Sequence, residues 1–400
     1  MHKIERLLQT LAPKGVEFRK LGEVLEYDQP NKYCVTSKEF DKSYLTPVLT
    51  AGKTFILGYT NEKDNIYQAS KNAPVIIFDD FTTATQWVDF PFKVKSSAMK
   101  ILLPKNPTIN IRFIFFYMQT IPYNISGEHT RQWISRYSKI TIPIPPLEVQ
   151  QEIVKILDAF TELNTELKAR KKQYEYYQNM LLDFNDIHSN HKDAKEKLAQ
   201  KTYPKNLKTL LQTLAPKGVE FRKLGEVCDF QKGKSITKKA VTFGKVPVIS
   251  GGRQPAYYHN EANRSGETIA ISSSGVYAGY VSYWDIPVFL ADSFSVSPKQ
   301  KTLMPKYLFY YLTTQQDTIH ATKSTGGIPH VYSKDLQNFL IPIPPLEIQQ
   351  EIVKILDQFL TTDLQTGIPA EIEARKKQYE YYREKLLTFK PLISHKEVKK

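Results

Sequence analysis

Residues 142–160 read IPIPPLEVQQEIVKILDAF, and residues 341–359 read IPIPPLEIQQEIVKILDQF. The two stretches differ only at Val149/Ile348 and Ala159/Gln358. Two further blocks recur in the same chain: LLQTLAPKGVEFRKLGEV at 7–24 and 210–227, and ARKKQYEYY at 169–177 and 374–382. Repeats of this length are the signature of a duplicated structural unit. The chain is therefore two copies of one module, each framed by the same three blocks.

The regions inside these frames, 25–141 and 228–340, have diverged almost completely. Only fragments align, such as PVLTAG at 47–52 with PVISGG at 247–252, and FIFFY at 113–117 with YLFYY at 307–311. Short apolar runs at 74–78, 268–271 and 279–284 alternate with Gly, Pro and Asn, which predicts strands. The aromatic runs near 113–118 and 307–312 predict one buried helix in each module. We expect α+β modules that do one job on different targets.

A long helix is predicted after the Pro145-Pro146 doublet, because good helix formers dominate from Glu148 to Leu182 without Gly or Pro. Its apolar positions follow a heptad stripe: Val149, Ile153, Ile156, Phe160, Leu163, Leu167, Tyr174, Tyr177 and Leu181, with Arg170 as the one interruption. The second copy repeats the stripe at Ile348, Ile352, Ile355, Phe359, Arg375, Tyr379, Tyr382 and Leu386. Such a stripe needs a partner helix.

Two equivalent helices related by a pseudo-two-fold axis are antiparallel, so we expect an antiparallel coiled-coil spacer between two modules. The alternative is that each stripe packs on its own globular core. The second copy carries six more residues between Phe359 and Ala374, among them Gly367 and Pro369. This insertion predicts an irregular turn near 366–370.

Length, charge and cysteine content limit the classes of protein to which this chain can belong. The chain has 400 residues, 41% of them apolar, and a formal charge of +14, which favours phosphate polymers or anionic lipid as partners. It has no run of 18 apolar residues, and its N-terminus is charged from the third residue, so we expect a cytoplasmic protein without a signal peptide. Its two cysteines, Cys34 and Cys228, are too few for a disulfide framework or a cysteine-based zinc site.

The stretches that resemble catalytic motifs each lack a residue that the motif requires. Gly233-Lys234-Ser235 lacks the first glycine of a phosphate-binding loop, since residue 228 is Cys. The Ile-Pro-Pro-Leu stretches at 144–147 and 343–346 lack the Asn or Asp that an amino-methyltransferase needs, and are more typical of a strand end before a helix. Ser272 to Ser274 form no nucleophile elbow, and His188 and His191 have no third ligand nearby. We therefore expect no catalytic residue, no metal and no cofactor, and a binding protein in place of an enzyme.

Two variable regions, each followed by a near-identical block that leads into a long helix, resemble the specificity subunit of type I restriction-modification systems. The blocks that carry the likeness are 7–24, 142–184, 210–227 and 341–389. The resemblance implies target recognition domains at 1–144 and 206–343, a central helix and linker at 145–205, and a C-terminal helix at 344–400. It also implies that each domain reads one half of a bipartite double-stranded DNA site. The implied partners are methyltransferase (M) subunits, two in number, and restriction (R) subunits reached through the complex, with no membrane.

Base contacts are expected from Arg or Lys to guanine and from Asn or Gln to adenine. Polar residues in variable loops give the DNA-binding candidates: Lys53, Arg131, Gln132, Arg253, Gln254 and Lys323. The candidates for the spacer and for subunit docking are Ile153, Ile156, Phe160, Leu163, Leu167, Tyr174, Tyr177, Ile352, Ile355, Phe359, Tyr379 and Tyr382. The repeated block also has Tyr176 and Tyr381, more aromatic surface than one seam needs, so some tyrosines are expected to contact the methyltransferase.

Two alternatives stay open at this point. A coiled-coil interaction scaffold without DNA binding would show no sequence-selective DNA binding even with its partners present. An enzyme with an unrecognised site would bind adenosylmethionine or ATP tightly as an isolated chain.

Overall fold

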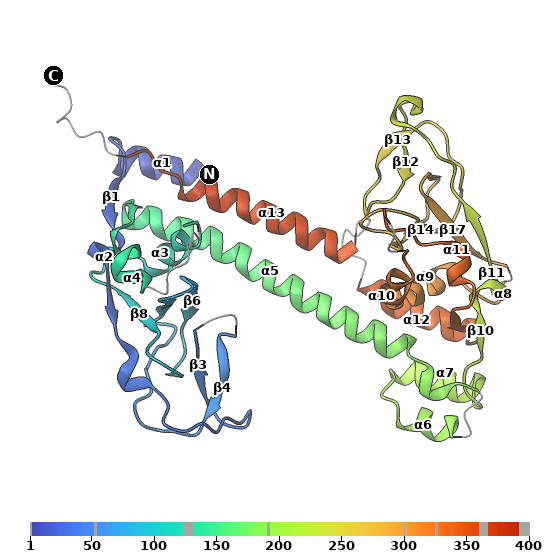
Figure 1. Cartoon of the computed structure of the whole chain (residues 1–400), viewed down its shortest axis with the longest axis horizontal. Helices are drawn as coiled ribbons and strands as arrows, with labels where there is room; N and C mark the ends of the chain where they lie inside the picture. Colours follow the sequence, from blue (N-terminus) through green and yellow to red (C-terminus); the bar gives the residue numbers. More distant parts are fainter. Residues whose placement is uncertain are drawn as a thin grey trace. The chain divides into compact units, whose positions relative to one another are not determined.

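The computed structural model describes residues 2–51, 54–122, 131–189, 193–299, 301–324, 327–359 and 367–391. The chain divides into two units (Figure 1), residues 1–165 with 373–400 and residues 166–372. Helix α5 (Leu147–Leu182) contributes its first part to the first unit and the rest to the second. The single long helix predicted over 148–182 is confirmed.

The described residues of the first unit form three small sheets. A four-stranded antiparallel sheet has the order β2 (Leu25–Asp28), β8 (Met99–Pro104), β5 (Val75–Asp79), β6 (Thr85–Val88). A three-stranded sheet has the order β4 (Ile56–Thr60), β3 (Thr46–Leu49), β7 (Lys93–Val94). The third sheet pairs β1 (Glu17–Lys20) with β9 (Thr141–Ile144), so strands from two shared blocks close the base of the variable region.

Besides parts of α5 and of a C-terminal helix, the described residues of the first unit form four shorter helices. They are α1 (His2–Leu11), α2 (Leu21–Val24), α3 (Ile111–Met118) and α4 (Gln132–Ser135), with single 3₁₀ turns at Pro30–Tyr33 and Tyr137–Lys139. The Asn110 side chain caps α3 by accepting from the backbone N–H groups of Arg112 and Phe113. Phe113, Ile114 and Phe116 of α3 are buried in one core with Val149 and Ile153 of α5. The predicted aromatic helix of the first module is confirmed.

The second unit repeats the strand order of the first. Its four-stranded sheet is β11 (Cys228–Lys232), β17 (Ser293–Pro298), β14 (Thr268–Ser272), β15 (Val281–Trp284). Its three-stranded sheet is β13 (Tyr257–His259), β12 (Val246–Ile249), β16 (Phe289–Leu290), and β10 (Phe221–Lys223) pairs with β18 (Leu340–Pro342). Identical topology in two diverged modules confirms the duplicated α+β architecture.

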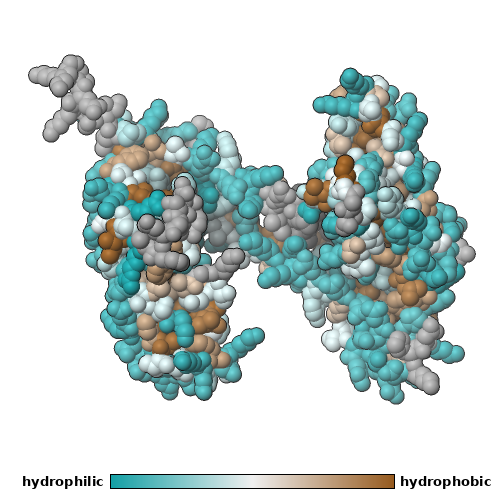
Figure 2. Space-filling model, viewed as in Figure 1, coloured by the Kyte–Doolittle hydropathy of each residue, from teal (hydrophilic) through white to brown (hydrophobic). Residues whose placement is uncertain are grey.

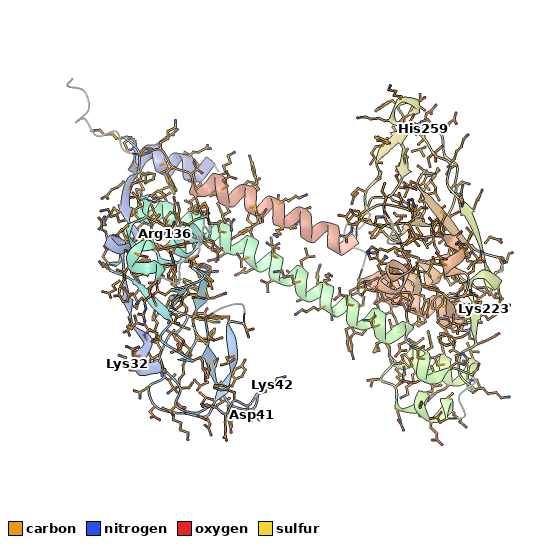
Figure 3. The ribbon with its side chains drawn as sticks, viewed as in Figure 1. Lys32, Asp41, Lys42, Arg136, Lys223 and His259 are labelled. Carbon is orange, nitrogen blue, oxygen red and sulfur yellow. The ribbon has the colours of Figure 1, made fainter. Side chains whose placement is uncertain are left out.

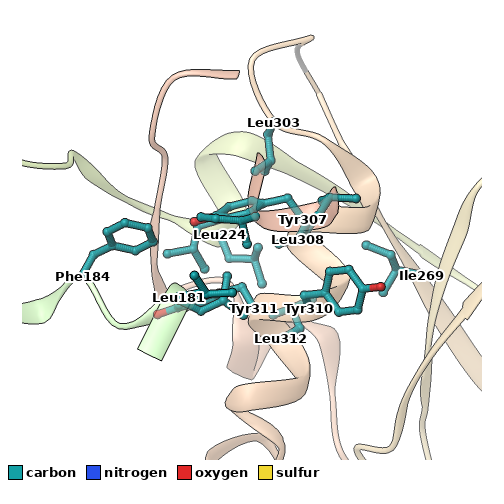
Figure 4. Close-up of a cluster of buried hydrophobic side chains, with 14 of the residues drawn as sticks. Leu181, Phe184, Leu224, Ile269, Leu303, Tyr307, Leu308, Tyr310, Tyr311 and Leu312 are labelled. Atoms are coloured by element: carbon teal, nitrogen blue, oxygen red, sulfur yellow. The ribbon is translucent and has the colours of Figure 1, made fainter. Parts of the chain in front are cut away.

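The helices of the second unit are α6 (Ala194–Gln200), α7 (Lys205–Leu214), α8 (Leu224–Val227), α9 (Pro305–Thr314), α10 (Gln316–Ala321), α11 (Ser333–Leu336) and α12 (Leu346–Gln358). Single 3₁₀ turns lie at Asn185–Ile187 and Lys238–Ala240. Helix α9 confirms the predicted second aromatic helix, and it begins with Pro305, a residue that suits the first turn because its missing N–H has no helical acceptor there. Figure 4 shows Leu181 and Phe184, at the end of α5, buried in one cluster with Tyr307 and Tyr311 of α9.

One buried glutamine joins each shared helix to its variable module. In the first unit Gln150 Oε1 accepts from the Asn110 N–H at 2.8 Å, and its Nε2 donates to the Pro145 carbonyl at 2.8 Å. In the second unit Gln349 makes the same bonds, accepting from the Met304 N–H at 2.8 Å and donating to the Pro344 carbonyl at 2.7 Å. These bonds satisfy backbone groups at the entry to α3 and α9, and unsatisfied buried groups there would cost about 1–3 kcal/mol each.

The predicted helix seam is present in the first unit. Helix α13 (Gly367–Leu387) lies alongside α5 (Figure 1), and Phe160 of α5 contacts Tyr379 and Tyr382 of α13 at ring distances of 6.3 and 5.5 Å. Later residues of α13, such as Leu386, share a core with earlier residues of α5, such as Ile153. The two helices are therefore antiparallel within this unit.

The second unit makes the reciprocal contact. Phe359, directly after α12, lies 6.2 Å from Tyr174 and 5.2 Å from Tyr177 of α5. The phenylalanine of one repeat thus meets the tyrosines of the other repeat in each unit. The pairing that the heptad stripe predicts is confirmed by contacts on both sides.

The predicted irregular turn at 366–370 is wrong in its position. Helix α13 begins at Gly367, so residues 367–370 are helical and the break between α12 and α13 comes earlier in the chain. Pro369 lies in the first turn of α13, where its missing N–H has no helical acceptor to lose. Residues 360–366 lie outside the part of the chain that the structure describes.

Candidate nucleic-acid interface

Two of the DNA-binding candidates of the second module lie on either side of one loop. The Arg253 guanidinium stacks over the rings of Tyr277 and Tyr280, at 4.8 and 5.7 Å from their centroids. Lys323 reaches the same loop through His320, whose Nδ1 lies 2.7 Å from the Ala278 carbonyl oxygen. Residues 70 positions apart in the sequence therefore flank the segment 274–280. We call this surface, made by 253–254, 274–280, 320–323 and 328–332, the second loop face.

The hydrogen bonds of His320 fix its tautomer. A carbonyl oxygen only accepts, so Nδ1 carries the hydrogen and donates to Ala278. Nε2 is then the acceptor for the Lys323 ammonium group, 3.0 Å away. A neutral His320 thus holds Lys323 at the loop, while the pi faces of Tyr277 and Tyr280 hold Arg253.

The tyrosines beneath Arg253 differ in burial. Tyr277 is exposed and Tyr280 is mostly buried. Burial raises the pKa of the Tyr280 hydroxyl, and the nearby Arg253 charge opposes that rise. Arg253 and its neighbour Gln254 are both exposed, so both side chains can reach a ligand.

The first module presents its candidates differently. Arg131 is exposed at the N-terminus of α4, whereas Gln132 is only 3% exposed and lies in the wall of a groove of about 320 Å³. Arg136, labelled in Figure 3, lines the same groove. Lys53 lies outside the described residues. Of the two candidates that the structure describes in the first module, Arg131 is therefore displayed at the surface and Gln132 is not.

A buried ion pair underlies Arg131. Asp80 Oδ1 accepts from the Trp133 N–H at 2.8 Å, and its Oδ2 lies 3.7 Å from the Lys100 ammonium group. Burial lowers the pKa of Lys100, Asp80 opposes this, and the Arg131 charge adds to it. Lys100 also donates to Gln29 and lies 4.4 Å from the Tyr27 ring. The network holds the start of α4 in place.

The two modules keep one backbone frame beneath different side chains. The Gln132 N–H donates to the Asp80 carbonyl at 2.8 Å, and the Val331 N–H donates to the Ser273 carbonyl at 2.9 Å. In the central sheets, Lys100 pairs with Phe78 in the first module, and Phe294 pairs with Ile271 at the matching place in the second. The frame is common, and the chemistry at the loops is specific to each module.

The spacer candidates show graded burial. Ile153 and Ile352 are fully buried, and Ile156 and Ile355 are partly buried against the same cores. Phe160, Phe359 and the tyrosines 174, 177, 379 and 382 form the ring contacts described above. Leu167 is half-buried, and Leu163 is 52% exposed. The stripe is covered near the cores and more open between them.

One tyrosine of each repeat faces solvent. Tyr176 is 61% exposed and Tyr381 is 58% exposed, although their neighbours Tyr177 and Tyr382 are packed in the seams. Tyr176 lines a groove of about 460 Å³ at the end of α5, together with Met180, Phe184, Phe221 and Tyr311. Two matching aromatic positions are thus displayed by the repeated sequence.

Sequence reasoning missed the side chains that hold the candidates in place. Tyr277, Tyr280 and His320 for the second module, and Asp80 and Lys100 for the first, came from the structure. A signal was present in the run GVYAGY at 275–280, where glycines and tyrosines alternate in a turn. Nothing in the sequence linked that turn to Arg253.

The described residues hold no group of three or more His, Cys, Asp or Glu side chains arranged for a metal ion. Cys228 is buried, and burial raises the pKa of its thiol to about 12. Among the helices of the described ranges, none has the length and apolar content to cross a membrane.

This chain resembles known proteins in sequence and in fold. The family model described as type I restriction modification DNA specificity domain matches twice, at residues 13–174 and 216–374. The type I restriction enzyme EcoR124I/EcoR124II specificity subunit of Escherichia coli is 39% identical over 97% of both chains. A crystal structure of a type I restriction-modification S subunit from M. genitalium aligns with a TM-score of 0.66 at 18% identity, over 93% of this chain and 96% of that one, and so shares its fold. Two matching domains and a full-length relative show that this chain belongs to the type I restriction-modification specificity subunits.

Proposed function

We propose that the chain is the non-catalytic subunit that reads a bipartite double-stranded DNA site. Residues 1–144 and 206–343 each read one half. The observation that carries this proposal is the common backbone frame with different side chains at the loops, seen in the bonds Gln132 to Asp80 and Val331 to Ser273. A duplicated reader needs one scaffold and two different sets of base contacts. The family supports this function and not the coiled-coil scaffold without DNA.

The physical basis of binding has two parts. The net charge of +14 attracts the phosphate backbone, which supplies affinity without sequence information. Exposed Arg and Gln side chains, such as Arg253 and Gln254, supply the choice of bases. Helix α5, with 36 residues, spans about 54 Å at 1.5 Å per residue. We propose that it sets the unread gap between the half-sites.

Partners complete the activity in this proposal. Two methyltransferase (M) subunits dock on the repeated surfaces, and restriction (R) subunits join through them. Methyl transfer, DNA cleavage and the cofactors that they use belong to those partners, and this chain binds no cofactor itself. The complex acts on genomic DNA in the cytoplasm. Repetition of the exposed Tyr176 at Tyr381 is the feature that suits two copies of one partner.

The decisive test is a selection from a random duplex library with the full chain reconstituted with its methyltransferase subunits. We expect enrichment of two short motifs separated by a fixed stretch of any sequence. Enrichment of one contiguous motif, or of none, would contradict the proposal.

Removing the two cations of the second loop face is expected to weaken specific binding. The double variant Arg253→Ala, Lys323→Ala loses about 1–3 kcal/mol for each side chain that contacts a base. For each one that contacts a phosphate, the slope of log affinity against log salt falls by about 0.9. Fluorescence anisotropy over a salt series separates the two cases. Lys301→Ala, an exposed lysine on the turn before α9, is the matched control, and equal losses in both variants would refute the assignment.

Truncating the displayed tyrosines is expected to remove partners one at a time. Tyr176→Ala or Tyr381→Ala each weakens one docking site by about 2 kcal/mol or more, the size of an aromatic hot spot. Native mass spectrometry of the complex then shows one methyltransferase subunit for each single variant and none for the double variant. Tyr258→Ala, an exposed tyrosine of the second variable region, serves as control. Unchanged stoichiometry in the double variant would exclude these tyrosines from docking.

A further inference from the structure

Two aliphatic side chains are displayed on the second loop face. Val276 is 80% exposed and Ile328 is 67% exposed. They belong to neighbouring loops, because the Gly275 N–H donates to the Pro329 carbonyl at 3.0 Å and Ser274 forms a β-bridge with His330. Val276 follows the donor of this hydrogen bond, Gly275, and Ile328 precedes its acceptor, Pro329. Two large apolar groups so near each other and so open to water are outside any core.

The backbone beneath them is specialised. Gly275 has a φ of 85° and Gly327 a φ of 105°, in the left-handed region that side-chain-bearing residues rarely adopt. Each glycine immediately precedes one of the two aliphatic residues. These turns hold Val276 and Ile328 outward, and the Ser273 carbonyl, bound by the Val331 N–H, fixes the second loop against the strand end of the first.

Cations and aromatic rings surround the pair. Arg253 stacks on Tyr277, which follows Val276. Lys323 is held by His320 on the Ala278 carbonyl. On the other side His330 stacks on the exposed Tyr332 at 6.0 Å, and Lys334 lies 5.4 Å from the same ring. Hydrophobic residues interrupt a hydrophilic surface on this unit (Figure 2). An apolar spot with Arg253, Lys323 and Lys334 held on the adjoining segments suits a polyanion that offers an apolar group.

Duplex DNA offers one such group in its major groove, the C5-methyl group of thymine. Aliphatic side chains have no hydrogen bond to give to a base edge, so contact with that methyl is the readout open to them. The charge around the spot complements phosphate and opposes a basic partner. Residues 274–280 also lie in the region that differs between the modules, as a segment that reads a module-specific half-site should.

We propose that Val276 and Ile328 contact the C5-methyl group of a thymine in the half-site read by the second module. This inference rests on the proposed DNA-reading function and adds the kind of base pair that the second half-site contains. It requires at least one A·T pair in that half-site.

The test replaces thymine by deoxyuridine, which removes the methyl group and keeps the hydrogen-bonding edge. Once the site is known from the selection, each thymine of the second half-site is replaced singly, and binding to the full complex is measured at fixed salt. At one position we expect the affinity of the unaltered protein to fall about fourfold, the value of one methyl-sized apolar group. In the double variant Val276→Ala, Ile328→Ala, the ratio of the affinity for the thymine duplex to the affinity for the deoxyuridine duplex is expected to fall to about one.

Controls separate readout from folding. Ile328→Leu keeps an apolar side chain and should retain the thymine preference, whereas Ile286→Ala removes an exposed aliphatic side chain on the turn after β15 and should leave the ratio unchanged. The inference would be overturned, with sequence-specific binding intact, by either of two results. One is equal affinity for the thymine and deoxyuridine duplexes at every position, and the other is a preference for thymine that survives in the double alanine variant. Loss of all sequence-specific binding in the unaltered complex would instead overturn the proposed function.

Discussion

Deleting residues 161–167 from α5 is expected to shorten the gap between the half-sites by one to three base pairs. A heptad removes about 10.5 Å of helix, which is at most about three base pairs at roughly 3.4 Å per pair. The deletion lies between Phe160 and Tyr174, so it removes none of the four rings that form the contacts of Phe160 with Tyr382 and of Tyr174 with Phe359. Seven residues also keep the apolar stripe in phase. The measurement is the position of methylated bases in DNA modified by the reconstituted complex.

Two controls define this result. Replacing residues 161–167 by seven alanine-rich helical residues keeps the length and should keep the gap. Deleting five residues rotates the stripe away from its partner and should cost stability without defining a new gap. A heptad deletion that modifies sites with the original gap would show that α5 does not set the spacing.

Exchanging residues 25–141 for the corresponding region of another family member is expected to change one half-site completely and leave the other unaltered. The graft joins at the base of the module, where β1 pairs with β9 through Lys20 and Thr141. Gln150 accepts from a backbone N–H at the entry to α3, so it tolerates a change of side chain there. Because we propose that each module makes its own base contacts through its loops, we expect the second motif to be unaffected.

Methylome sequencing of cells that carry the hybrid measures both motifs at once. The matched control is the hybrid made at 228–340, which should alter the other half-site. A hybrid in which both motifs change would contradict independent reading by the two modules. A hybrid in which neither changes would place the base contacts in the shared frame.

Several features were predictable from sequence because they depend on local pattern. The heptad stripe predicted α5 and its antiparallel partner, and Phe160 and Phe359 meet the tyrosines of the opposite repeat as that pattern requires. The doublet Pro145-Pro146 separates β9 from α5, as the strand-end interpretation of those prolines predicts. The prediction of a turn at Pro369 was wrong because a proline can break a helix from within or lie in its first turn. Tertiary context selects between the two, and here Pro369 lies in the first turn of α13.

Less of the candidate site could be predicted from the sequence. Arg253 and Lys323 are separate loop residues in the sequence, and their placement on one face depends on the contact of Arg253 with Tyr277 and on His320, which links Lys323 to Ala278. Gln132 and Arg131 are adjacent polar residues in the sequence, but the structure buries Gln132, which is 3% exposed, and exposes Arg131. Val276 and Ile328 carry no motif at all.

Pattern along the chain is enough to establish the duplication, the α+β class, the long helix, its seam and the family. Each of these follows from periodicity or identity along the chain, where neighbouring residues act together. Which loops meet, which polar groups are buried and which apolar groups are exposed could be known only from the folded chain. Those outcomes depend on contacts between residues far apart in sequence, and their free energies are set by packing and by the satisfaction of buried hydrogen bonds, which no local pattern records.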